Sequence, residues 1–185
     1  MTRFGYVIAT VVTAQAFIVL FVTVALANPR PRVIWNASAS APIGFYRIHA
    51  DDDPPSGALV AVTPPRPWAR WIAERGYLPE GVPLLKHVEA KAGQRVCRIG
   101  NKVSVDRRPV AVALDRDSQG RQLPVWQGCH KLRSGEFLFM NPSVPDSLDG
   151  RYFGPLSATT LLGRATPMLT RDTADGPLIW RGIAP

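Results

Sequence analysis

The stretch "RVCRIGNKVSVDRRPVAVAL", residues 95–114, sets the expectation for the fold. It contains three short runs rich in β-branched residues, 95–100, 102–106 and 108–114, and each run has the length of a strand. Only residues 66–78, which place Trp68, Trp71 and Ile72 on one face, predict a helix in this part of the chain. Comparable strand-like runs, closed by glycine and proline turns such as 51–57, occur at 44–50, 58–65, 82–90, 135–141 and 161–169. The pattern predicts a mainly β domain.

A long apolar run precedes this domain. Residues 4–27 hold no charged side chain, and as a helix they would be roughly 36 Å long, enough to cross a hydrocarbon core of about 30 Å. "ALAN" at 25–28 offers the small residues of a signal-peptide cleavage site, and a secreted binding domain would require cleavage after Ala27. The run exceeds the roughly 7–15 residues of a signal-peptide core, so we expect a retained transmembrane anchor, followed by a proline- and arginine-rich connector at 28–35.

The orientation of this anchor is open from charge alone. Arg3 precedes the run, whereas Arg30 and Arg32 follow it, so the positive-inside rule does not favour an external domain. Cys97 and Cys129, the two cysteines of the chain, favour the opposite placement if they form a disulfide, because disulfides persist in oxidising compartments. Such a bond would contribute roughly 3–4 kcal/mol in the chain-entropy description, and the alternative is two buried thiols.

The composition also bears on partners. The 185 residues carry 22 Lys and Arg against 14 Asp and Glu, a net charge of +8, with the basic residues scattered along the chain. This predicts a solvated basic surface, or attraction to anionic lipid headgroups or acidic peptides. The sequence shows no nucleic-acid-binding motif, and the isolated His49, His87 and His130 predict neither a metal site nor a cofactor.

Two stretches could supply a nucleophile and its base. "NASASAPIGFYRI", residues 36–48, offers Ser38 and Ser40, but a serine hydroxyl needs a base to attack. Lys86 in "GVPLLKHVEA", residues 81–90, stands among apolar residues, and desolvation would favour the neutral amine that a base requires. Alternatively, Lys86 points to solvent on an edge strand.

A third stretch, "NPSVPDSLDGRYFGPL" at 141–156, surrounds Arg151 with Asn, Ser, Asp and Gly. It reads either as a polar loop with Asx turns or as a hydrogen-bonding frame that could hold a lysine and a substrate backbone.

Four features occur in order along the chain: the expected anchor, then S-x-P-x-G-x-Y, P-L-x-K-x-V and D-x-R-Y-F-G-P. This order resembles the type I signal peptidase family, in particular its conjugative-transfer (TraF-type) branch. The resemblance implies that Ser40 is the nucleophile, Lys86 the base, and Ser38 a structural residue or an aid to the oxyanion site. It also gives Asp149 and Arg151 supporting roles. Family members have a serine between the aspartate and the arginine of this motif, whereas this chain has Gly150. The hydroxyl of Ser147 or Ser143 could take the place of the missing one.

The resemblance further implies a signal-peptidase-like β-rich catalytic domain at 28–185, behind an anchor at 4–27 and a cytoplasmic segment at 1–3. It implies a single-pass protein of the bacterial inner membrane with its catalytic domain in the periplasm. The partner would be a membrane-inserted, pilin-like precursor, processed without a cofactor by hydrolysis or with cyclisation. The alternative is a catalytically inactive structural component of a conjugative secretion apparatus.

Overall fold

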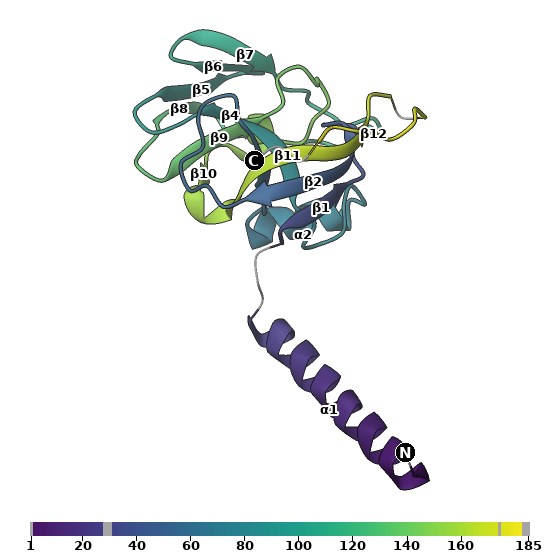
Figure 1. Cartoon of the computed structure of the whole chain (residues 1–185). Coiled ribbons are helices and arrows are strands. Elements are labelled where there is room, and N and C mark those ends of the chain that lie inside the picture. The colour runs from purple at the N-terminus through teal and green to yellow at the C-terminus, as the bar shows by residue number, and fades with distance from the viewer. Residues whose placement is uncertain (1, 28–30, 174, 183–185) are drawn as a thin grey trace. The chain divides into compact units, whose positions relative to one another are not determined.

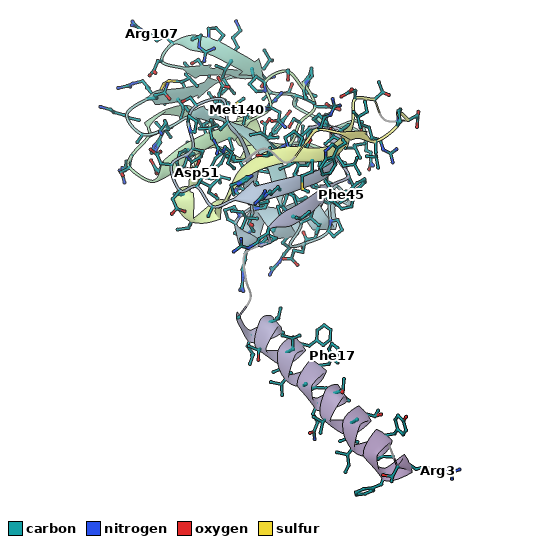
Figure 2. All side chains as sticks on the ribbon, viewed as in Figure 1. Arg3, Phe17, Phe45, Asp51, Arg107 and Met140 are labelled. Atoms are coloured by element: carbon teal, nitrogen blue, oxygen red, sulfur yellow. A yellow bond between two sulfur atoms is a disulfide. The ribbon has the colours of Figure 1, made fainter. Side chains whose placement is uncertain are left out.

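The computed structural model describes residues 2–27, 31–173 and 175–182. The chain divides into two compact units, Met1–Pro31 and Arg32–Pro185. The first unit is the helix α1 (Arg3–Ala27), whose 25 residues bury no side chain within the protein. Figure 2 shows its side chains, including Phe17, projecting outward from the helix.

Helix α1 is long and apolar enough to cross a membrane. Its hydroxyls are satisfied internally, because Thr10 Oγ1 donates to the Tyr6 carbonyl (2.9 Å) and Thr23 Oγ1 to the Val19 carbonyl (2.8 Å). Such bonds lower the cost of placing threonine in hydrocarbon, where water cannot supply a partner. The helix that the sequence predicts at 4–27 is therefore present, one residue longer at its start.

The second unit is mainly β, as predicted, and contains two antiparallel sheets (Figure 1). The larger sheet has the order β1-β2-β11-β3-β4-β9-β10, with β12 paired to β11. Its strands are β1 (Val33–Asn36), β2 (Ile43–His49), β3 (Leu59–Val62), β4 (Leu84–Ala90), β9 (Glu136–Met140), β10 (Leu156–Ser157), β11 (Leu161–Arg171) and β12 (Ile179–Trp180). The smaller sheet, β7-β6-β5-β8, consists of β5 (Arg95–Ile99), β6 (Lys102–Val105), β7 (Arg108–Val112) and β8 (Gly128–Lys131).

One prediction for this unit is wrong. Residues 33–35, expected in the connector, and Asn36, expected in the loop that follows, form β1, because Val33, Ile34 and Trp35 suit an extended backbone and pair antiparallel with β2. Residues 28–30 of that connector lie outside the described residues.

Apolar clusters fix the two sheets and the short helices. One cluster joins the sheets through side chains of β4, β5, β6 and β9, among them Met140 (Figure 2). Another holds α2 (Arg66–Glu74) and the single turn α3 (Gly150–Phe153) beside the start of β4. The Trp68 ring lies 4.9 Å from the Phe153 ring, so this partly buried tryptophan packs against the cluster. A 3₁₀ turn, η1 (Ala158–Thr160), leads into β11.

Candidate active site

The loop between β1 and β2 carries both candidate serines, and Asn36 shapes it from within. Asn36 is buried, and its Nδ2 lies 2.9–3.1 Å from the carbonyl oxygens of Ser38, Ala41 and Pro42. Its Oδ1 accepts from the backbone N–H and the hydroxyl of Ser38. One amide thus contacts three carbonyls of the loop, and it fixes the path of the chain around Ser40.

Lys86 lies in the middle of the larger sheet. Its strand, β4, pairs with β3 on one side and β9 on the other, so the edge-strand alternative is wrong. The side chain is 3% exposed, and its Nζ lies 3.3 Å from Ser40 Oγ and 2.8 Å from Ser147 Oγ. The structure therefore brings together a hydroxyl and an amine that are 46 residues apart in the chain.

This burial changes the chemistry of the amine. Desolvation lowers the pKa of Lys86 from 10.5 to about 8, against the opposing attraction of Asp149. The charge of Arg151 adds to the decrease. With a pKa near 8, roughly a quarter of the molecules hold a neutral amine at pH 7.5, against about 0.1% for an ordinary lysine.

Asp149 and Arg151 form a buried ion pair beside this lysine. The Arg151 guanidinium is 1% exposed and contacts both carboxylate oxygens at 2.9 Å. It also donates to the carbonyls of Asn141, Val144 and Pro145 at 2.8–3.0 Å. A buried pair is stable only when its remaining donors and acceptors are satisfied, and here the surrounding loop supplies those partners. The pair therefore holds the loop that carries Ser147.

Gly150 stands where the resemblance led us to expect a serine, and the space around it excludes one. A Cβ at this position would lie 2.6 Å from Leu138 Cδ1 and 2.9 Å from the Phe139 carbonyl oxygen, so β9 leaves no room for a serine. The hydroxyl that reaches Lys86 comes instead from Ser147, which is 3% exposed. Ser143, the other candidate for this role, is exposed to solvent.

Asn141 is a site residue that the sequence reasoning missed. Its Nδ2 donates to the carbonyls of Ser40 (2.7 Å) and Leu85 (3.0 Å), and its backbone N–H donates to Asp149 (2.9 Å). It therefore ties the serine loop, the lysine strand and the ion pair together. Asn36 and Asn141 each begin a stretch that the sequence singles out, and a search for side chains able to satisfy loop carbonyls would have found them.

Ser38 lies beside Ser40, with 3.0 Å between the two hydroxyl oxygens. Two cavities meet at Ser40, one of about 300 Å³ on the side of Lys86 and one of about 350 Å³ on the side of Pro42. Ser40 is half-buried between them, so a chain laid across both cavities would pass over its hydroxyl.

Cys97 and Cys129 form a disulfide. They are directly opposite each other on β5 and β8 of the smaller sheet. Within the described residues, no group of three or more His, Cys, Asp or Glu side chains could hold a metal ion.

Comparison with known proteins places nearly all of helix α1 and most of the second unit in one family. Residues 4–169 match the family described as signal peptidase, peptidase S26. A Sinorhizobium fredii protein named "Probable conjugal transfer protein TraF" is 41% identical over 146 residues, covering 73% of this chain and 76% of that protein. "Conjugal transfer protein TraF" of Agrobacterium fabrum is 37% identical over 149 residues, covering 74% and 82%. "Plasmid transfer protein TraF" of Escherichia coli is 32% identical over 146 residues, covering 73% and 81%.

Among solved structures, a signal peptidase I from Enterococcus faecalis superposes with a TM-score of 0.37 at 15% identity, covering 62% of this chain and 97% of that one. The family match spans the candidate serines, Lys86, Asp149 and Arg151. The chain therefore belongs to the signal peptidase family, peptidase S26.

Proposed function

We propose that this protein is a membrane-anchored serine endopeptidase in which Ser40 is the nucleophile and Lys86 the general base. One observation carries the proposal: a lysine 3% exposed, with its pKa lowered to about 8, places Nζ 3.3 Å from the hydroxyl of Ser40. A buried amine within hydrogen-bonding reach of a hydroxyl is the arrangement that lets lysine replace histidine as the activating base.

In the first step, neutral Lys86 accepts the proton of Ser40 as Oγ attacks the carbonyl carbon of a peptide bond. Ser147 receives an N–H of the same amine, which leaves the lone pair directed toward Ser40. A tetrahedral intermediate forms, and Lys86, now an ammonium, returns its proton to the leaving amine.

The oxyanion of this intermediate needs donors close to Ser40. The backbone N–H of Ser40 is one candidate, and the hydroxyl of Ser38, 3.0 Å from Ser40 Oγ, is the second. In the resting structure the Ser38 hydroxyl donates to Asn36 Oδ1 (2.9 Å), so it must rotate toward the oxyanion when charge develops there. Ser38 would then exchange a neutral acceptor for a charged one, which makes the stronger bond.

The acyl-enzyme on Ser40 is resolved by a second nucleophile. Water gives a carboxylate and a shortened product, whereas attack by an amine of the substrate gives a cyclic peptide. The chemistry at Ser40 and Lys86 is the same in both cases, because the neutral lysine deprotonates whichever nucleophile arrives.

The substrate that we propose is an exported, membrane-inserted precursor from which a signal or propeptide segment is removed. The TraF relatives are named for conjugal or plasmid transfer, which supports a pilin-like precursor. With α1 as a retained anchor in the inner membrane and residues 28–185 in the periplasm, the enzyme and its substrate meet at the bilayer surface. Tethering both to one membrane raises their effective concentration without new contacts. The Cys97–Cys129 disulfide is consistent with an oxidising compartment.

The alternative of an inactive scaffold rested on Gly150, which removes a family hydroxyl. The 2.8 Å contact from Ser147 to Lys86 returns a hydroxyl to the same amine, so this departure no longer favours the scaffold.

The test is processing of a co-expressed pilin-like precursor in membranes, read by mass spectrometry. Wild type is compared with Ser40→Ala, Lys86→Ala and Lys86→Arg, and with Ser134→Ala as the matched control, because Ser134 is exposed and lines neither cavity. We expect processing by wild type and the control and none by the three others, because a guanidinium keeps its proton. The product mass distinguishes hydrolysis from ring closure. Processing by the folded Ser40→Ala or Lys86→Arg variant would refute the pair.

A further inference from the structure

Arg98 is a buried cation that the proposed mechanism does not use. It lies on β5 of the smaller sheet, next to Cys97, and is 0% exposed. Among the described residues its hydrogen-bond acceptors are backbone carbonyls, those of Gly100 (3.2 Å), Pro124 (3.2 Å) and Arg151 (2.6 Å). Removing a charge from water is costly, and these three carbonyls, which come from three separate segments, offset part of that cost.

The shortest of these bonds satisfies a carbonyl that α3 cannot satisfy by itself. In a continuing helix the carbonyl of Arg151 would accept the N–H of residue 155. That residue is Pro155, which has no N–H, and the N–H of Gly154 donates to the Gly150 carbonyl instead (3.0 Å). The guanidinium of Arg98 therefore supplies the donor that the chain after α3 lacks.

Trp126 holds the neighbouring carbonyl of the same turn. Its indole Nε1 donates to the carbonyl of Gly150 (3.0 Å), one residue before Arg151. The Trp126 ring packs against the apolar cluster that joins the two sheets. Two consecutive carbonyls of α3 are thus bound by side chains from two segments that meet at the smaller sheet.

The disulfide constrains the spacing of these two donors. Arg98 directly follows Cys97 on β5, and Trp126 precedes Cys129 on β8 by three residues. Cys97 and Cys129 are bonded across the β5–β8 pair. Because a covalent bond joins the two strands, Arg98 and Trp126 contact α3 as one unit.

The turn that they hold carries the groups beside Lys86. The guanidinium of Arg151 binds Asp149 and the carbonyls of the loop that leads to Ser147. Ser147 Oγ in turn lies 2.8 Å from Lys86 Nζ. A displacement of α3 would therefore reach the amine through a chain of direct contacts.

We infer that Arg98 and Trp126 are positioning residues of the candidate active site, which fix the turn at Gly150–Arg151 and, through it, the placement of Lys86 against Ser40. This inference rests on the proposed function and adds to it the smaller sheet, whose described strands line neither cavity. Weakening this contact admits water to Lys86 and moves the amine relative to Ser40, while the surfaces on which a substrate would lie stay as they are.

The experiment measures cleavage by the full chain in detergent micelles of a peptide spanning the bond that is cut in the co-expressed precursor. Arg98→Met removes the donors, Arg98→Lys keeps a charged donor, and Trp126→Phe keeps a ring without its N–H. We expect kcat to fall by roughly 10- to 100-fold in Arg98→Met, less in Arg98→Lys, and by about 3- to 10-fold in Trp126→Phe. KM should stay within about twofold of wild type, because only the reacting groups are displaced.

The pH–rate profile separates positioning from a loss of stability. Burial is the largest cause of the lowered pKa of Lys86, and the two charges that act on it, Asp149 and Arg151, have opposite effects. Water admitted by a displaced loop should therefore raise this pKa and move the midpoint of the profile to higher pH in the variants. A variant that is only less stable loses folded enzyme, which thermal unfolding measures, and keeps the wild-type midpoint.

The matched controls are Arg95→Met, at an exposed position on the same strand, and Trp180→Phe, at a residue 57% exposed; both residues lie outside the two cavities and should keep wild-type kinetics when replaced. A wild-type kcat and midpoint in Trp126→Phe and in the folded Arg98 variants would overturn the inference and leave the proposed function standing. If neither Arg98 variant folds, Trp126→Phe alone decides. Cleavage by wild type no faster than by Ser40→Ala would instead overturn the proposed function and the inference with it.

Discussion

The Nζ of Lys86 lies 2.8 Å from Ser147 Oγ, closer than the 3.3 Å that separates it from Ser40 Oγ. In the resting structure the amine is thus held most closely by a hydroxyl that takes no part in the attack. In the proposed mechanism Ser147 is a positioning residue, because it would act on the substrate only through Lys86.

Replacement of Ser147 by alanine should lower kcat by about 10- to 100-fold with little change in KM, because the amine loses the bond that directs it toward Ser40. The apparent pKa in the pH–rate profile should also fall, since the hydroxyl dipole stabilises the ammonium. Steady-state kinetics across pH on the full chain would measure both. Ser134→Ala, at an exposed serine outside both cavities, is the control, and a Ser147→Ala profile identical to wild type would contradict the positioning role.

The activity should depend on pH through Lys86. Its pKa of about 8 means that kcat/KM rises up to that pH and falls about tenfold for each pH unit below 7, because only the neutral amine accepts the proton of Ser40. Rates measured between pH 5.5 and 9.5, with circular dichroism to verify folding at each pH, would test this. A flat profile across pH 6–8 would argue against lysine as the base.

The burial of Lys86 should also lower the free energy of unfolding of the protein. Between pH 8 and 10.5 the unfolded chain binds more protons at Lys86 than the folded protein does, so wild-type stability rises with pH across this window and is lowest below pH 8. At about 1.4 kcal/mol per pH unit between the two pKa values, the penalty below pH 8 is about 3 kcal/mol. Lys86→Met removes this penalty, but it also loses the hydrogen bond to Ser147, which offsets part of the gain. The variant should therefore be more stable than wild type by about 2 kcal/mol at pH 7.

Thermal unfolding of both proteins at pH 7 and pH 10.5 would measure the difference. The gain of Lys86→Met should largely vanish at the higher pH. A variant less stable than wild type at pH 7 would show that the lysine is better solvated than its 3% exposure indicates.

Restoring the serine that the family has between the acid and the arginine should harm this protein. Gly150→Ser places a Cβ 2.9 Å from the Phe139 carbonyl oxygen and 2.6 Å from Leu138 Cδ1, and the strand carbonyl has little freedom to move. We expect a loss of about 1–3 kcal/mol in the free energy of unfolding. Gly150→Ala should lose a similar amount, because the clash arises from the Cβ. A stable, active Gly150→Ser variant would show that β9 can shift to make room for the added Cβ.

The features of the fold that could be predicted from the sequence are local ones. The apolar run of α1 and the strands from β5 to β7 follow from composition and alternation within a few residues. The strand order of the larger sheet could not be predicted, because β11 pairs with both β2 and β3, which lie far from it in the chain. β1 was missed because prolines and arginines just before it suggested a connector.

For the candidate site, the order of motifs that resemble a family predicted Ser40, Lys86 and the Asp149–Arg151 region. Their assembly depends on β4 lying inside the larger sheet, which no local pattern specifies. The sequence left Ser147 and Ser143 as equal candidates, since both precede Asp149 by a few residues. Only the path of the loop, held by Arg151, makes one buried and the other exposed.

The carboxamide of Asn141 donates to the carbonyls of Ser40 and Leu85, and so spans from the loop of the nucleophile to the strand of the base. An amide does not ionise, and these bonds persist at any pH at which the protein is folded. The distance between Ser40 and Lys86 should therefore not depend on which of the two holds the proton. If Ser40 and Lys86 act as we propose, a pH–rate curve would report the protonation of Lys86 rather than a rearrangement of the site.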